Sequence, residues 1–148
     1  MPKVIILMGS KSDMEIMKKG ADFLTENNIE NEVIVASAHR NPARVHEISK
    51  RIEEEVDVVI AGAGMAAHLA GVLASLTIKP VIAVPIGSSP LGGQDALLSS
   101  VQMPPGIPVA TVAINGAKNA AILAMEIMGL YHPDIKQKVI KLRESFNA

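Results

Sequence analysis

Several residue types that define whole classes of protein chemistry are absent from this sequence or rare in it. It has no cysteine and no tryptophan, and its aromatic residues are Phe23, Tyr131 and Phe146. Without cysteine there is no disulfide, no thiolate nucleophile and no cysteine-ligated iron–sulfur cluster. So few rings leave little to stack on nucleic-acid bases or on a flavin. The composition therefore points away from thiol and flavin chemistry.

Charge and hydropathy also argue against two kinds of partner. The 14 Lys and Arg residues are balanced by 15 Asp and Glu, which gives a net charge of −1 and no positive field to favour nucleic acid. No apolar run reaches the roughly 18 residues of a membrane span, and the short run at residues 4–8 does not resemble a signal peptide. We expect a cytoplasmic protein with no nucleic-acid or membrane partner, in which residues 1–148 form a single domain.

What the chain does have in quantity is apolar side chains, which make up 49% of it. Apolar surface that one small core cannot cover usually means contacts between subunits. A parallel sheet whose strands are buried on both faces also raises the apolar fraction. Both explanations apply here, and we expect a homo-oligomer.

The order of the apolar segments predicts the fold. Five short runs, at residues 4–8, 33–36, 58–61, 81–84 and 109–113, are nearly continuous rather than alternating, as in buried parallel strands. Helical periodicity separates them, with helices expected after Asp13, from Pro42, over 66–76 and 117–130, and from Pro133. This alternation predicts an α/β protein, a flavodoxin-like three-layer sandwich with a doubly wound parallel five-stranded sheet and a C-terminal helix.

The most informative segment follows the second predicted strand, at residues 37–42 (SAHRNP). It places His39 beside Arg40 at the carboxyl end of a strand, where ligands bind in open α/β sheets. An imidazole moves a proton near neutral pH, and a guanidinium holds a phosphate with its planar fork. The pair predicts an enzyme that acts on a small phosphorylated molecule.

The first strand leads into a loop of small and polar residues, 9–13 (GSKSD). Such a loop lets backbone N–H groups approach an anion, although it lacks the Walker A spacing. Asp13 would repel a phosphate, so as a binding residue it would accept hydrogen bonds from ribose hydroxyls. The alternative is that Asp13 is an ordinary N-cap of the next helix.

The third strand leads into residues 62–68 (GAGMAAH), which match a dinucleotide fingerprint in letters but not in context. The motif follows the third strand rather than the first, and the next strand has no acidic residue for a ribose. Gly62 and Gly64 are expected to form the floor of a site, where the lack of a side chain lets the backbone lie close to a ligand. His68 is either a neutral residue lining that site or a structural histidine. The long, Gly- and Ser-rich loop at 85–95 is expected to form a wall or lid.

Metal and serine-hydrolase chemistry lack their motifs. No H-x-x-H, H-E-x-x-H or carboxylate triad is present, and neither is G-x-S-x-G. His46 and His132 are expected at the surface or at a helix cap. We therefore expect neither a metal site nor a nucleophilic serine.

Taken together, four motifs resemble the PurE family, which carboxylates aminoimidazole ribonucleotide in purine biosynthesis. They are GSKSD at 9–13, SAHR at 37–40, GAGMAAHL at 62–69 and SVQMPPGIP at 100–108. They occur in the family's order and spacing, and the match covers nearly the whole chain. No single motif would be specific enough by itself.

The resemblance implies a flavodoxin-like subunit in a homo-octamer that uses neither metal nor cofactor. The bacterial type is a mutase that moves a carboxyl group from N5 to C4 of N5-carboxyaminoimidazole ribonucleotide, with CO2 released and recaptured inside the site. His39 is then the general acid/base, and Ser10, Asp13 and Arg40 hold the ribose phosphate. The full set of substrate-binding residues that we expect is Ser10, Ser12, Asp13, Ser37, Arg40, Gly62, Gly64, Ala66, His68 and Leu69.

Two departures from the family pattern bear on the subclass. Ala70 stands where the family more often has proline, and residues 113–119 (AINGAKN) are shorter than the usual bacterial version. A second class carboxylates aminoimidazole ribonucleotide directly with CO2, typically has Lys after the active-site His, and lacks the run that ends in His68. Arg40 and His68 favour the mutase. A non-catalytic nucleotide-binding module, a flavodoxin-type carrier and a receiver domain are the remaining alternatives.

Overall fold

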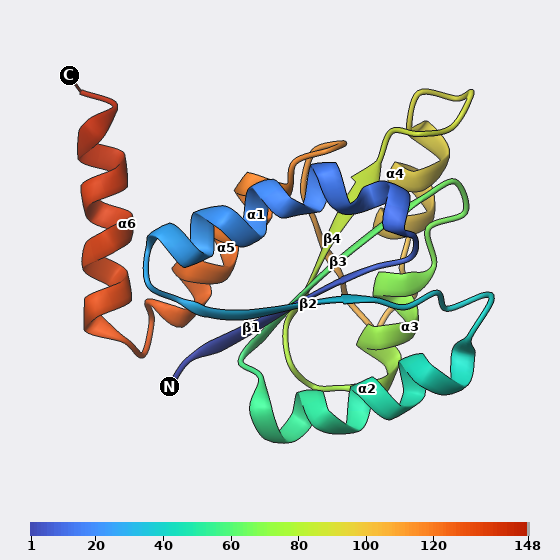
Figure 1. Cartoon of the computed structure of the whole chain (residues 1–148), viewed down its shortest axis with the longest axis horizontal. Helices are drawn as coiled ribbons and strands as arrows, with labels where there is room; N and C mark the ends of the chain where they lie inside the picture. The colour runs from blue at the N-terminus through green and yellow to red at the C-terminus, as the bar shows by residue number, and fades with distance from the viewer. Residues whose placement is uncertain (148) are drawn as a thin grey trace.

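A computed structural model of the chain describes residues 1–147, in which five parallel strands form one sheet in the order β2-β1-β3-β4-β5 (Figure 1). This is the strand order of doubly wound flavodoxin-like folds, so the predicted fold class is confirmed. The strands are β1 (Lys3–Met8), β2 (Glu30–Val35), β3 (Val58–Gly64), β4 (Val81–Ile86) and β5 (Ala110–Thr111).

Helices cover both faces of the sheet and divide the core into two halves. One half joins Val4, Ile6 and Met8 to α1 and α5, and the other joins Ile5 and Leu7 to α2 and α3. Both faces of β1 are therefore apolar, which explains its continuous apolar sequence. The helices are α1 (Met14–Glu26), α2 (Pro42–Glu55), α3 (Leu69–Leu76), α4 (Gln94–Val101), α5 (Ala117–Met128) and α6 (Pro133–Ser145), with a short 3₁₀ helix η1 (Lys11–Asp13) before α1.

The two edge strands differ most from the predicted strands. β2 begins at Glu30, three residues before the predicted run, because an edge strand tolerates the polar residues that open it. β5 consists of Ala110 and Thr111 alone, which pair with Ile82 and Ala83 of β4. The predicted run at 109–113 was therefore too long, since pairing on one side holds only this short part of it.

Two helices depart from the predicted pattern. α3 begins at Leu69 rather than at residue 66, because residues 65–68 form the turn after β3, in which Met65 has a φ of +55° and the backbone N of His68 donates to the carbonyl oxygen of Ala66. α6 lies at one edge of the molecule (Figure 1), where Arg143 near its end pairs with Glu126 of α5 at 3.2 Å. Of its expected apolar stripe, Ile135 is buried but Phe146 is 70% exposed. The amphipathic pattern therefore leaves apolar surface uncovered.

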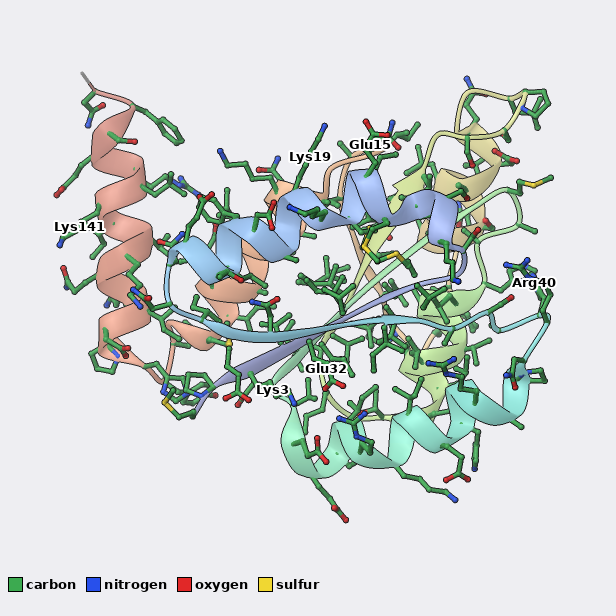
Figure 2. The ribbon with its side chains drawn as sticks, viewed as in Figure 1. Lys3, Glu15, Lys19, Glu32, Arg40 and Lys141 are labelled. Atoms are coloured by element: carbon green, nitrogen blue, oxygen red, sulfur yellow. The ribbon has the colours of Figure 1, made fainter. Side chains whose placement is uncertain are left out.

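The two ends of the sheet differ in their charged groups, as Figure 2 shows. Lys3 and Glu32 lie near the amino ends of β1 and β2 and form an ion pair of 3.1 Å between Nζ and Oε2. Arg40 lies at the opposite end, beyond the carboxyl end of β2. Among residues 1–147, no helix combines the length and apolar character that crossing a membrane requires.

Candidate active site

The loops at the carboxyl ends of the first four strands enclose a cavity of about 510 Å³. This size suits a small-molecule ligand. Its lining includes every predicted site residue except Gly62, so segments that lie far apart in the sequence meet as the resemblance implied. The residues that sequence reasoning missed in this lining are Gly9, Ala38, Ala63, Met65 and Ser88.

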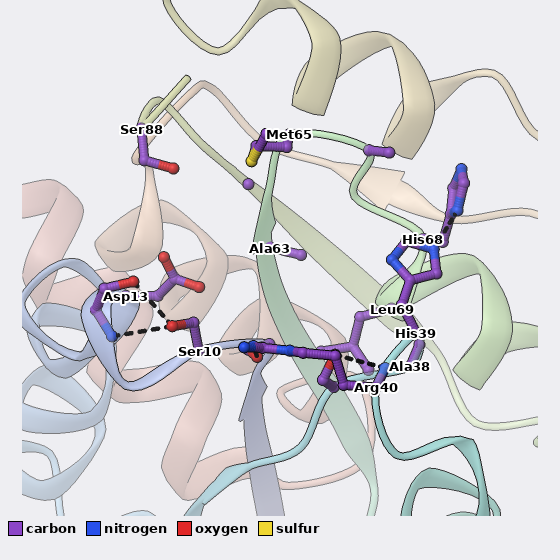
Figure 3. A pocket seen from close by; sticks show the side chains of 15 residues that line it. Ser10, Asp13, Ala38, His39, Arg40, Ala63, Met65, His68, Leu69 and Ser88 are labelled. Atoms are coloured by element: carbon purple, nitrogen blue, oxygen red, sulfur yellow. Dashed lines mark hydrogen bonds between the residues drawn. The ribbon is translucent and has the colours of Figure 1, made fainter. Parts of the chain in front are cut away.

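The loop after β1 presents Ser10 and Asp13 to the cavity (Figure 3). Ser10 is the N-cap of η1, where its Oγ accepts hydrogen bonds from the backbone N and the hydroxyl of Ser12 at 3.3 and 2.9 Å. Asp13 precedes α1, but its side chain makes no capping hydrogen bond. Asp13 therefore occupies the N-cap position of α1, as the alternative interpretation expected, but its side chain does not cap the helix.

Asp13 is unusual because it is a carboxylate that is only 5% exposed. Burial raises the pKa of Asp13 above its ordinary value, while a backbone hydrogen bond from Ser10 and the positive charge of Arg40 partly offset that effect. A buried acceptor that lines a cavity can bind ligand hydroxyl groups. This placement favours the binding interpretation of Asp13.

Arg40 is held over the first loop by hydrogen bonds to two neighbouring segments. Its Nη2 donates to the carbonyl oxygen of Gly9 at 2.7 Å, and its Nε donates to Ser37 Oγ at 3.3 Å. Ser37 Oγ also accepts from the backbone N of Arg40 at 3.1 Å. Because a guanidinium has five N–H donors, these bonds fix its plane and leave donors free for an anion.

His39 and His68 come from different strand ends and meet at the cavity. His39 Nε2 lies 2.7 Å from His68 Nδ1, and the two rings are nearly perpendicular, at 84°. Both side chains are exposed, which argues against a purely structural histidine at position 68. One ring nitrogen must donate and the other accept, so each imidazole determines how the other holds its proton.

The two glycines predicted to form the floor have different roles. A Cβ on Gly62 would lie 2.4 Å from Met17 Sδ, so this glycine makes room for the core under α1 and does not line the cavity. The expectation for Gly62 is corrected accordingly, because Gly62 lies further back along β3, where Met17 of α1 covers it, whereas Gly64 lies at the carboxyl end of the strand. Gly64 does line the cavity, and a Cβ there would lie 2.5 Å from Ser88 Oγ.

Two of the missed residues come from loops that the sequence marks only in part. Ser88 belongs to the long loop after β4, whose length predicts a wall of the site but does not single out a residue. Met65 is 62% exposed and has a left-handed backbone conformation. A methionine in the sequence does not predict this conformation. Within residues 1–147, no group of three or more His, Cys, Asp and Glu side chains is arranged to hold a metal ion.

The fold and the cavity together define a class of protein. The carboxyl edge of a doubly wound sheet brings a guanidinium, a buried carboxylate and two imidazoles to one cavity, which is the arrangement of an α/β protein that binds a small molecule. The sequence matches the AIR carboxylase family over residues 3–148. The chain therefore belongs to the AIR carboxylase family.

Two relatives and one solved structure show how far the likeness extends. The N5-carboxyaminoimidazole ribonucleotide mutase of Pyrococcus abyssi is 59% identical over 145 residues, which cover 97% of this chain and 83% of that protein. The mutase of the same name from Methanocaldococcus jannaschii is 58% identical over 141 residues, or 95% of this chain and 88% of that protein. The crystal structure of Treponema denticola PurE superposes with a TM-score of 0.91 at 36% identity and covers 99% of this chain and 92% of that one.

Proposed function

We propose that this chain is an N5-carboxyaminoimidazole ribonucleotide mutase of purine biosynthesis, which moves the carboxyl group of its substrate from N5 to C4. One observation carries the proposal: the His39–His68 pair and the Arg40 guanidinium line the same cavity. A group that transfers protons therefore lies within one ligand's length of a group that binds phosphate. The mutase names of relatives that are 58–59% identical support the same reaction.

In this proposal the first loop and Arg40 bind the part of the substrate that does not react. Arg40 receives the phosphate with the N–H groups that Gly9 and Ser37 leave free. Ser10, Ser12 and Ser37 supply hydroxyl groups, and Asp13 accepts hydrogen bonds from the ribose. Binding energy from this remote half orients the imidazole against His39.

His39 acts as general acid and then as general base on the reacting half. Its imidazolium protonates N5 as the bond between N5 and the carboxyl carbon breaks, which releases CO2 and the free amine. C4 then attacks the CO2 carbon, and the neutral imidazole removes the C4 proton, so that His39 ends in its starting state. His68 is the positioning residue, because its Nδ1 is the hydrogen-bond partner of the reacting imidazole.

The intermediate CO2 must stay in the site between the two steps. It has no charge and no dipole, so it is retained by close walls rather than by a strong electrostatic contact. Gly64, Ala66 and Leu69 lie along the lining and provide small or apolar surface. No metal or cofactor takes part in this scheme.

A second reaction, direct carboxylation of aminoimidazole ribonucleotide by CO2, is favoured by the name of the family itself. A paired assay of the purified protein, without ATP or metal, separates the two by following the C4-carboxylated product. Efficient turnover of N5-carboxyaminoimidazole ribonucleotide, with the unmodified ribonucleotide reacting only at very high bicarbonate, supports the mutase. Efficient use of the unmodified ribonucleotide at low bicarbonate overturns it in favour of the carboxylase. If neither substrate gives the product, the chain is a non-catalytic nucleotide-binding module.

The proposal also covers the assembly and the location of the enzyme. We infer a homo-oligomer, with eight copies as the number that the family resemblance implied, and a cytoplasmic enzyme. The uncovered apolar residues at the α5–α6 end support subunit contacts: Leu130 and Tyr131 are 77% and 83% exposed. The number of copies stays a prediction.

A further inference from the structure

The loop between β4 and α4, residues 87–93, forms one wall of the cavity and contributes Ser88 to its lining. Figure 3 shows Ser88 at the end of the cavity where Asp13 and Ser10 lie, with His39 and His68 toward the other end. The hydroxyl of Ser88 lies where a side chain on Gly64 would be, 2.5 Å from the position of a Cβ. Its neighbour Ser89 is engaged inside the loop, where its Oγ donates to Asp95 Oδ1 at 2.7 Å.

This loop is held from outside by Asn115, which follows β5. Asn115 Oδ1 accepts a hydrogen bond from the backbone N of Gly87 at 2.8 Å, and the backbone N of Asn115 donates to the carbonyl oxygen of Pro85 at 2.8 Å. Both bonds end within three residues of Ser88. Asn115 therefore fixes the backbone where the loop leaves β4.

The backbone of Asn115 adopts an unfavourable conformation. Its φ is +61°, in the left-handed region that disfavours most side chains and that asparagine tolerates better than most. The adjacent Ile114 packs on both ends of the loop, since a Cβ on Gly87 or on Gly93 would lie 3.0 or 2.9 Å from its Cγ2. Ile114 and Asn115 thus form a tight turn fitted to the loop that carries Ser88.

We propose that Asn115 is a positioning residue for substrate binding: by holding Gly87, it sets the Ser88 hydroxyl against Gly64 as a hydrogen-bonding group for the ribose-phosphate half of the ribonucleotide. This inference rests on the proposed function, because it takes the cavity as the ribonucleotide site. Ser88 lies away from the histidine pair, so the contact contributes to binding rather than to proton transfer. Its loss raises KM and Kd and leaves kcat nearly unchanged.

The test uses two variants of Asn115 that both tolerate its backbone conformation and differ in whether they keep a side-chain acceptor. Asn115→Gly tolerates the left-handed φ but loses the acceptor, whereas Asn115→Asp tolerates it and keeps an acceptor. We expect Asn115→Gly to raise KM, and the Kd for aminoimidazole ribonucleotide in calorimetry, by about threefold to tenfold, as for one lost neutral hydrogen bond. Asn115→Asp should stay within twofold of the wild type.

Asn28→Gly is the matched control, because Asn28 also has a left-handed φ, of +56°, and lies in the turn between α1 and β2, outside the cavity lining. It should leave KM and Kd unchanged. Ser88→Ala should match the effect of Asn115→Gly, and the double variant should be no worse than either single variant, because Asn115 acts through Ser88.

Either of two results would overturn the inference. In the first, Asn115→Gly weakens binding by the same factor with and without Ser88. In the second, an active wild-type enzyme keeps its KM and Kd in both single variants while their melting temperatures show that they fold. A wild type that binds the ribonucleotide without turning it over, with Kd changing across the variants as expected, would instead disprove the proposed function and support the role of Asn115.

Discussion

At the scale of single residues, the hydrogen bond between His39 and His68 is the feature with the most direct chemical meaning. At 2.7 Å between Nε2 and Nδ1, one ring nitrogen donates a hydrogen bond that the other accepts, so each ring fixes the tautomer and the orientation of the other. A group that must first give and then take one proton benefits from a partner that fixes its tautomer and its orientation. The exposure of both rings leaves them open to a ligand in the cavity.

Replacing the proton-transfer group should separate chemistry from binding. We expect His39→Asn to lower kcat by about 10²- to 10⁴-fold, the usual contribution of general acid–base catalysis, and to change the Kd of the ribonucleotide by less than about threefold. Single-turnover kinetics and calorimetry measure the two quantities. His46→Asn, which changes an exposed histidine of α2, is the control and should behave as wild type. Equal losses in binding and turnover would contradict the assignment.

The buried carboxylate of Asp13 has opposite effects on ligand binding and on the stability of the fold. Burial raises its pKa above the ordinary value of about 3.9, so just above that pH the folded chain binds more protons than the unfolded chain. Stability therefore falls as the pH rises through the raised pKa of the folded state. Once ionised, the buried side chain destabilises the fold, and the same negative charge makes it a stronger acceptor for a ligand hydroxyl.

Removal of this charge should stabilise the protein and weaken its function. Asp13→Asn should raise Tm at pH 7, lose that advantage below about pH 3.9, and raise KM because an amide is a poorer acceptor for ribose hydroxyls. Thermal unfolding between pH 3 and pH 8 measures the first effect. Asp22→Asn is the control, since it removes an exposed carboxylate paired with Lys18 and should not raise Tm. A lower Tm for Asp13→Asn at pH 7 would contradict this account.

At the scale of elements, charged residues connect three segments at the end of the sheet opposite the cavity. Glu32 of β2 pairs with Lys3 of β1 at 3.1 Å and with Arg51 of α2 at 2.8 Å, and Glu55 of α2 contacts both of these cations. Hydrogen bonds from Arg51 and Lys3 lower the pKa of Glu32. Together these bonds tie the polar edge strand to its neighbour and to the helix beside it.

The lowered pKa gives this network a defined pH dependence. Its stabilisation is present above the ordinary pKa of Glu32, about 4.3, and is lost as the pH falls through the lower pKa of the folded state. Glu32→Gln should lower Tm by about 1–3 °C at pH 7, as expected for a partly exposed ion-pair network, and by much less at pH 3. Glu47→Gln, which breaks the isolated pair with Lys50, should change Tm less. An equal effect of Glu32→Gln at both pH values would contradict the electrostatic origin.

At the scale of the whole molecule, the single chain exposes more surface than a compact monomer of the same mass. Its accessible surface is 7905 Å², compared with about 7,200 Å² for a compact monomer of this mass. Large apolar side chains are exposed near α6 and on α4, among them Phe146 and Leu98 at 70% and 56%. Surface of this kind is typical of a subunit.

Sedimentation velocity should therefore find a particle several times heavier than the 15.6 kDa chain. Leu130→Glu combined with Tyr131→Glu should shift the distribution toward smaller species, because two charges would be buried in an apolar contact. Far-UV circular dichroism of the same sample checks that the variant remains folded. A single 15.6 kDa species of the wild-type protein at every concentration would contradict the assembly.

The order of the elements and most of the residues of the candidate site could be predicted from the sequence. Continuous apolar runs mark strands buried on both faces, and polar residues directly after them fall at the edge where ligands bind, so His39, Arg40, Asp13 and Ser10 could be named in advance. Strand β2 was partly missed because an edge position relaxes the apolar pattern. These features depend on interactions that are local along the chain.

How distant segments meet could not be predicted from the sequence, because it depends on the packing of elements against one another. The 2.7 Å contact of His39 with His68, the place of Gly62 over Met17 and the position of Ser88 against Gly64 depend on which strand ends become neighbours. The segment at 113–119 stood out in the sequence only as a departure from a family pattern, and its contact with Gly87 spans 28 residues. Periodicity records which side of an element is buried, but the partner that buries it is set by packing between elements.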